Sequence, residues 1–124
     1  MTDRKQALIE LRDKVKAGDD AGFRRANRAA FSTPCQDLAL QLREEHCRHA
    51  YKGSLDAAKA LHEAVLPGWF IRSLVQRGEE IWKVVIWPDF SIVGIEDMKA
   101  GTSSNPARAW LIVILEALIA QEDT

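Results

Sequence analysis

The sequence predicts an α+β fold, a helix/sheet/helix sandwich in which a three-stranded antiparallel meander lies between helices. Three observations predict it: apolar residues recur at helical spacing as far as residue 66, the period shortens toward two between residues 69 and 95, and both alternating sets of positions there are apolar. A sheet with two apolar faces must be covered on both sides. At 124 residues we expect a single domain over residues 1–124, with a helical N-terminal extension at 1–48 and the sandwich core at 50–121.

Four helices are predicted before the sheet, because apolar residues three and four apart follow recognisable caps and precede recognisable stops. Gly18 is a C-terminal stop, Thr33-Pro34 is a start signal, Ser54 is a cap, and Pro67-Gly68 ends the fourth helix. The expected helices run from about Asp3 to Ala17, from a cap at Asp19 or Asp20 to Phe31, from Thr33 to between His49 and Gly53, and from Ser54 to Leu66.

The sheet is predicted from three stretches rich in β-branched and aromatic side chains, at about 69–76, 81–87 and 90–95. Turn residues separate them. The middle stretch is apolar on both faces. Its two alternating sets are Trp82, Val84 and Ile86 on one side and Ile81, Val85 and Trp87 on the other. Residues 98–104 lack this pattern and are the expected mobile loop.

A long apolar helix is predicted at about 106–121, where Asn105 is the cap and Pro106 occupies the first turn. Its body is apolar except for Arg108 and Glu116. A helix that is hydrophobic nearly all round is either central to the core of its own chain or packed against a partner. The sequence is therefore compatible with burial of this helix within the chain and with a homodimer formed through it.

The composition narrows the classes of function. The formal net charge of −1 gives no whole-molecule attraction to nucleic acid or anionic lipid. The most apolar run, residues 109–115, is too short to span a bilayer, so no membrane association is expected. In one helix Cys35 and Cys47 would lie roughly 18 Å apart, too far for a disulfide. Two unpaired thiols favour the cytoplasm.

No residue pattern indicates catalysis, a cofactor or a metal, so we expect a non-enzymatic protein without a cofactor. The phosphate-binding, dinucleotide-binding and hydrolase motifs are absent from the sequence. His46, Cys47 and His49 match no zinc spacing. His62 falls inside the apolar arc of its helix, where a buried histidine with a satisfied hydrogen bond is favoured over a catalytic base.

Two groups of residues are candidates for binding. Arg24, Arg25 and Arg28 form the one concentrated basic patch, which could follow phosphates; a solvated helix face is favoured, because acidic residues adjoin it. The tryptophans could stack bases, but three of the four occupy core-like positions. Trp87, beside a turn, is the one whose exposure matters most.

Two blocks of the chain resemble a known family. SLDAAKALHEAVLPGW at residues 54–69 and NPARAWLIVILEALIA at residues 105–120 look like the signature blocks of a family of small, uncharacterised bacteriophage and prophage proteins that is common in alphaproteobacteria. The general plan is similar to the helix/sheet/helix (ABA) sandwich domains of phages. The resemblance covers roughly residues 50–121 and implies provenance and fold, with no catalytic residue.

The sequence therefore predicts a non-enzymatic accessory protein of a phage or prophage that acts by binding another protein. An inhibitor of a host defence complex is one form of this hypothesis. The alternative from another class is a nucleic-acid-binding regulator that uses Arg24, Arg25 and Arg28. A third hypothesis is an enzyme whose site assembles from distant residues, with His62 as the participant.

Overall fold

The computed structural model describes residues 4–31, 38–88 and 98–122, with side chains left undescribed at 38–41. These residues form five helices and one three-stranded antiparallel sheet, so the fold is α+β. The elements in chain order are α1 (Arg4–Ala17), α2 (Asp20–Phe31), α3 (Leu38–Tyr51), α4 (Leu55–Val65), β1 (Phe70–Gly78), β2 (Ile81–Trp87), β3 (Lys99–Ser103) and α5 (Pro106–Gln121).

Three of the helices begin at side-chain caps that the sequence predicts. Asp19 Oδ1 accepts the Gly22 amide at 3.0 Å before α2, and Ser54 Oγ accepts the Ala57 amide at 3.1 Å before α4. Asn105 Oδ1 accepts two amides at the start of α5, and proline follows it in the first turn. These bonds satisfy donors that a helix N-terminus leaves without a partner in the helix.

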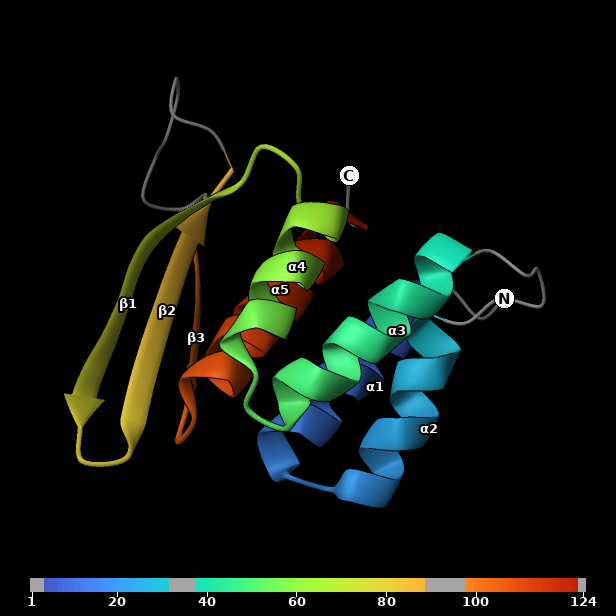
Figure 1. Ribbon diagram of the computed structural model, residues 1–124, viewed down its shortest axis with the longest axis horizontal. Helices are drawn as coiled ribbons and strands as arrows, with labels where there is room; N and C mark the ends of the chain where they lie inside the picture. The colour runs from blue at the N-terminus through green and yellow to red at the C-terminus, as the bar shows by residue number, and fades with distance from the viewer. Residues whose placement is uncertain (1–3, 32–37, 89–97, 123–124) are drawn as a thin grey trace.

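Helix α5 is the centre of the molecule. It packs against β2 and β3 on one side and against α1, α3 and α4 on the others, and Figure 1 shows it between the sheet and the N-terminal helices. Eleven of its 16 residues are buried. Its apolar circumference is thus covered within a single chain. The Arg12–Glu116 ion pair, at 2.7 Å, joins α1 to one of its few polar positions.

The strand order is β1-β2-β3, and both pairs are antiparallel. The prediction for the third strand is wrong in part: residues 98–104, expected to be a loop, contain β3. Residues 90–95, expected to be the strand, lie outside the described residues. Strand β3 has few β-forming side chains, and its position is set by pairing with β2 and by close packing of Gly101 on α5.

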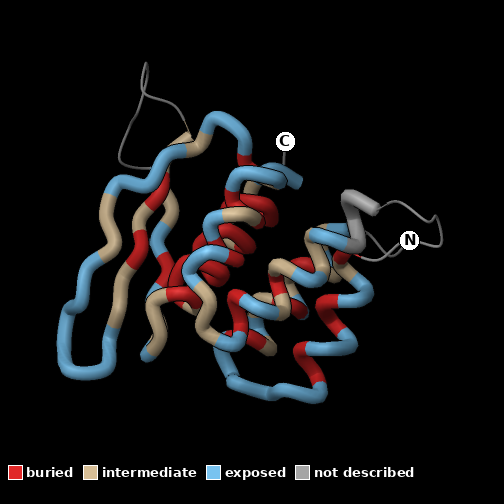
Figure 2. The backbone as a smooth tube through the Cα atoms, in the orientation of Figure 1, coloured by how far each residue is buried: buried red, intermediate tan, exposed pale blue. Residues whose placement is uncertain are grey.

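The prediction that helices cover both faces of the sheet is also wrong for the described elements. Val84 and Ile86 are fully buried toward α5, whereas the side chains that alternate with them are exposed or half-buried. Among the described helices only α5 makes substantial contact with the sheet, and it lies on one face. Figure 2 shows the result, with exposed residues along β1 and buried residues along α5. The layers are sheet, then α4 with α5, then α1 to α3.

The described helices and strands share one hydrophobic core. Its buried residues run from Leu8 in α1 to Ile119 in α5, so the N-terminal helices pack into the same cluster as the residues near the sheet. Within the described part of the chain, no helix has the length and hydropathy needed to cross a membrane.

Candidate functional site

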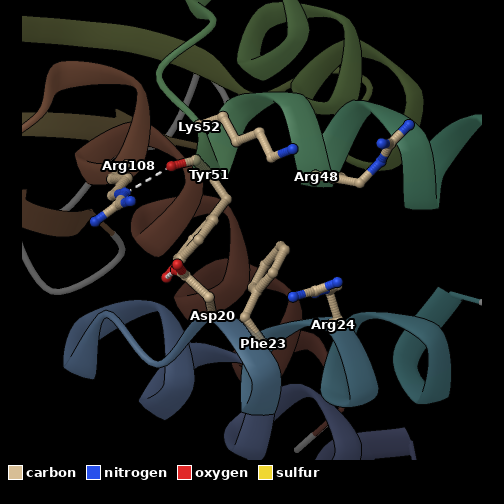
Figure 3. A pocket seen from close by; sticks show the side chains of 7 residues that line it. All are labelled: Asp20, Phe23, Arg24, Arg48, Tyr51, Lys52 and Arg108. Atoms are coloured by element: carbon tan, nitrogen blue, oxygen red, sulfur yellow. Dashed lines mark hydrogen bonds between the residues drawn. The ribbon is translucent and has the colours of Figure 1, made fainter.

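A basic cavity of about 360 Å³ lies between α2, the C-terminal end of α3 and the first turn of α5 (Figure 3). Its inner wall is aromatic. The rings of Phe23 and Tyr51 stack with 4.0 Å between their centroids, and both residues are almost fully buried. The Tyr51 hydroxyl donates a hydrogen bond to the Asp20 carboxylate, which ties α3 to the start of α2. The hydrogen bond and the ring stack thus fix the position of Tyr51 in the wall.

Four cationic side chains surround this wall. They come from three helices or their ends: Arg24, Arg48, Lys52 and Arg108. Arg48 also lies 3.5 Å from Glu45, an exposed pair of little energetic value. For Arg24 and Lys52 the described part of the chain offers no hydrogen-bond or ion-pair partner. Charge of one sign is thus concentrated in a concave site, which focuses the electrostatic potential.

Arg108 is held by two contacts with Tyr51. Its Nε donates to the Tyr51 carbonyl oxygen at 2.6 Å, and its guanidinium carbon lies 4.1 Å from the centroid of the Tyr51 ring. The first contact satisfies a carbonyl at the C-terminus of α3, and the second is a cation–π contact. Together they fix the plane of the guanidinium beside the cavity.

Burial raises the pKa of Tyr51, and the hydrogen bond to Asp20 raises it further, against the opposing charge of Arg108. The hydroxyl therefore keeps its proton and acts as a donor to Asp20. A tyrosine held in this way positions the cavity wall and is not a nucleophile or a base at neutral pH.

The three arginines of the basic patch expected on α2 stay together in the structure, where Arg24, Arg25 and Arg28 line a shallow hollow of about 230 Å³. Arg24 alone of the three also lines the basic cavity. Arg28 also lines a cavity of about 380 Å³ whose other side carries Glu44 and Glu45. No local sequence pattern predicts the basic cavity, because the cations that line it with Arg24 come from α3, the residue after α3, and α5.

A second candidate surface is the side of the sheet that faces away from α5, here called the outer sheet face. Alternation with the buried positions of β2 and strand register place on it, among others, Phe70, Val75, Ile81, Lys83, Val85 and Trp87. Arg72, which falls in a register shift of β1, belongs to this face through its contact with Trp87. Trp87 is half-buried, and the Arg72 guanidinium carbon lies 5.5 Å from its ring centroid. Phe70, Val75 and Ile81 are 38%, 40% and 52% exposed.

His62 lies in the core and borders none of the cavities described above. It is 5% exposed, its Nδ1 lies 3.2 Å from the Trp110 indole nitrogen, and its Nε2 lies 3.0 Å from the Trp69 carbonyl oxygen. Both ring nitrogens are thus occupied by protein groups. His62 is therefore not placed to contact a substrate, as the hypothesis of an enzyme site assembled from distant residues requires.

The residues considered for a metal are not brought together. In the described part of the chain no three histidine, cysteine or carboxylate side chains gather closely enough to hold an ion. Cys47 is fully buried, and burial raises the pKa of its thiol well above the ordinary value. Cys35 lies outside the described residues.

No protein-family model matches this chain, and neither the curated proteins nor the solved structures searched contain a match. The resemblance of residues 54–69 and 105–120 to phage proteins stays a prediction.

Proposed function

We propose that this protein is a non-catalytic binding protein whose outer sheet face docks a protein partner with an apolar and acidic surface. The observation that carries the proposal is the exposure of Phe70, Val75 and Ile81 on a sheet face that no described helix covers. Apolar side chains gathered on one exposed face are typical of interaction surfaces. The proposal agrees with an accessory protein of a phage or prophage that acts through another protein.

The charges of the sheet indicate the chemistry of the partner. The strands contain four basic residues, Arg72, Arg77, Lys83 and Lys99, and no aspartate or glutamate. On the outer sheet face, Arg72 and Lys83 flank the apolar positions. A partner with carboxylates around an apolar centre would complement this pattern, because interface potentials match in sign and position. A second copy of the chain would bring the same cations and no strand carboxylate.

The face of the sheet is a better docking surface than its edge. Strand β1 is an edge strand in the described sheet, but its pairing with β2 is interrupted between Ile71 and Ser73 and again between Gln76 and Gly78. Each irregularity places an arginine in the strand, Arg72 or Arg77. Bulges and cationic side chains are features that protect an edge from pairing with another strand.

The experiment begins with affinity capture from a bacterial host extract, followed by purification of the captured protein and calorimetry. The test variant is Val75→Ser with Ile81→Ser, and the matched control is Leu42→Ser, because Leu42 in α3 is as exposed as Ile81 at 52%. We expect Kd to rise at least about tenfold for the double variant and to change less than about twofold for the control. Lys83→Glu and added salt are expected to weaken binding in the same direction.

Three results would overturn the proposal. The first is equal binding by the wild-type protein and the double variant. The second is a dimer, against the chain mass of 13.9 kDa, that Ile81→Ser dissociates, because the face would then serve self-association. The third is retention of single-stranded nucleic acid that Ile81→Ser abolishes, because exposed aromatic and basic side chains would then bind bases and phosphates.

A further inference from the structure

The basic cavity carries more positive charge than its own acid can neutralise. Arg24, Arg48, Lys52 and Arg108 line it against the single carboxylate of Asp20, and with Arg48 set aside because it lies 3.5 Å from Glu45, three positive charges less one negative give a net +2. That carboxylate already accepts the Tyr51 hydroxyl. Like charges held around one hollow repel each other, and an anion bound among them relieves the repulsion.

The donors have the form that an oxoanion needs. The described contacts of Arg108 use its Nε and the face of its guanidinium, which leaves Nη1 and Nη2 without a partner in the described part of the chain. Arg24 of α2 and Lys52, the residue after α3, line the same cavity (Figure 3). A planar guanidinium can donate two parallel hydrogen bonds to phosphate oxygens, and an ammonium adds a point charge.

The wall strengthens this recognition. Phe23 and Tyr51 are 1% and 4% exposed, so one side of the hollow is apolar protein rather than water. Electrostatic attraction is less screened beside such a surface. The volume of about 360 Å³ is at the small end of the range for small-molecule sites. It therefore suits a phosphate group with a compact organic substituent.

We propose that the basic cavity is a binding site for a small phosphate-bearing molecule, held by Arg24, Lys52 and Arg108. This site lies on the helical side of the molecule and does not depend on the function proposed for the outer sheet face. A nucleic-acid backbone fits less well, because Glu44 and Glu45 border the adjoining cavity and interrupt the basic track that a polyanion would follow.

The test is calorimetric titration of the full chain with inorganic phosphate and with pyrophosphate at constant ionic strength. Arg24→Gln with Lys52→Gln removes two exposed cations of the cavity without disturbing the core. Arg25→Gln is the matched control, since Arg25 is exposed on the same helix and does not line the cavity. We expect saturable binding of pyrophosphate, weakened at least about tenfold in the double variant and less than about twofold in the control.

The outcomes separate this site from general electrostatic attraction. An unchanged circular-dichroism spectrum and unfolding midpoint in the double variant would show that its loss of binding is not a loss of folding. No saturable binding of either anion by the wild-type chain overturns the proposal. The proposal is also overturned if Arg25→Gln weakens pyrophosphate binding as much as the double variant does. A third contrary result is a single-stranded oligonucleotide that binds more tightly than pyrophosphate and loses as much affinity in Arg25→Gln as in the double variant.

Discussion

The indole Nε1 of Trp110 donates a hydrogen bond to Nδ1 of His62 across 3.2 Å in the core. An indole nitrogen is only a donor, so Nδ1 must be unprotonated. The proton is then on Nε2, which donates to the Trp69 carbonyl oxygen at 3.0 Å. One neutral histidine thus joins α4, α5 and the residue that precedes β1.

Replacing His62 with leucine would leave the Trp110 N–H and the Trp69 carbonyl without partners inside the protein. We expect the free energy of unfolding to fall by about 2–3 kcal/mol, because buried polar groups that lose a partner keep their desolvation cost. Urea unfolding followed by tryptophan fluorescence measures it. His49→Leu, at an exposed histidine of α3, is the control and should change stability by less than about 0.5 kcal/mol. Equal stabilities of the two variants would contradict this role for His62.

The position of His62 could be predicted from its place on a helical wheel, but its partners could not. Periodicity places a residue on a face of its own helix, and Trp110 is 48 positions away in the chain. The same limit applies to the basic cavity. Arg24 belongs to a local basic cluster that the sequence reveals, whereas in the sequence Arg108 is only a polar interruption in an apolar helix. Pairing between helices is a tertiary property that local patterns do not encode.

Gly101 is expected to tolerate no side chain. A Cβ at this position would lie 2.6 Å from the Ala109 carbonyl oxygen and 2.8 Å from the Val113 amide nitrogen, so β3 and α5 would have to separate. Gly101→Ala should therefore lower the free energy of unfolding by about 1–3 kcal/mol. Gly78→Ala is the control within the sheet, because its nearest neighbour is Ile81 at 3.8 Å. Thermal unfolding of both variants checks the difference, and equal midpoints would refute the close approach.

This close approach explains why β3 was not predicted. Lys99–Ser103 contains a single β-branched residue, Thr102, and no large apolar side chain, whereas residues 90–95 are more apolar and match the pattern of a strand better. Gly101 faces α5, and its lack of a side chain lets the β3 backbone lie against the helix. Because glycine is not typical of strands, the residue that positions β3 also weakens the sequence pattern by which a strand is predicted. The covering of both sheet faces was overestimated for a related reason. Alternation shows that a face is apolar, but it does not show that a helix of the same chain covers it, and no described helix packs on the outer sheet face.

Cys47 should make stability depend on pH in the alkaline range. Burial, followed by the charge of Glu44, raises the pKa of its thiol above the ordinary value of 9.0. As the pH rises past 9, the unfolded chain loses this proton while the folded chain retains it, so the unfolded state is favoured. The free energy of unfolding should fall by up to about 1.4 kcal/mol per pH unit from this group. Tyr51 acts in the same direction, since its pKa is also raised.

The measurement compares Cys35→Ser with Cys35→Ser/Cys47→Ala in urea at several pH values between about 7 and 10. Above pH 9 the free energy of unfolding should fall more for Cys35→Ser, which retains Cys47, than for Cys35→Ser/Cys47→Ala. This difference in slope does not depend on how much Cys47→Ala changes stability at neutral pH. In the folded state Cys47 should also react slowly with iodoacetamide, because a buried thiol is neither accessible nor ionised. Parallel pH profiles of the two chains would be incompatible with the raised pKa.

Asp19 should make the free energy of unfolding fall as the pH falls in the acid range, the opposite of the effect of Cys47 at alkaline pH. The backbone hydrogen bond from Gly22 is the main cause that lowers the pKa of its carboxyl, and Lys14, 3.5 Å away, lowers it further. The carboxylate therefore stabilises the folded chain above the ordinary pKa of 3.8, and this contribution is lost as the pH falls through the lowered native value.

Asp19→Asn separates the charge of this cap from its hydrogen bond. Asparagine also accepts amides at helix N-termini, so α2 should keep its cap while the titrating group is removed. Between about pH 5 and pH 2 the wild-type chain should lose more stability than Asp19→Asn, while all other carboxyl groups titrate alike in both. Asp13→Asn is a suitable control, since Asp13 is exposed and caps no helix. If Asp19→Asn and Asp13→Asn gave the same acid profile, the cap would not be the source of the effect, and the start of α2 would depend on its packing against α1 instead.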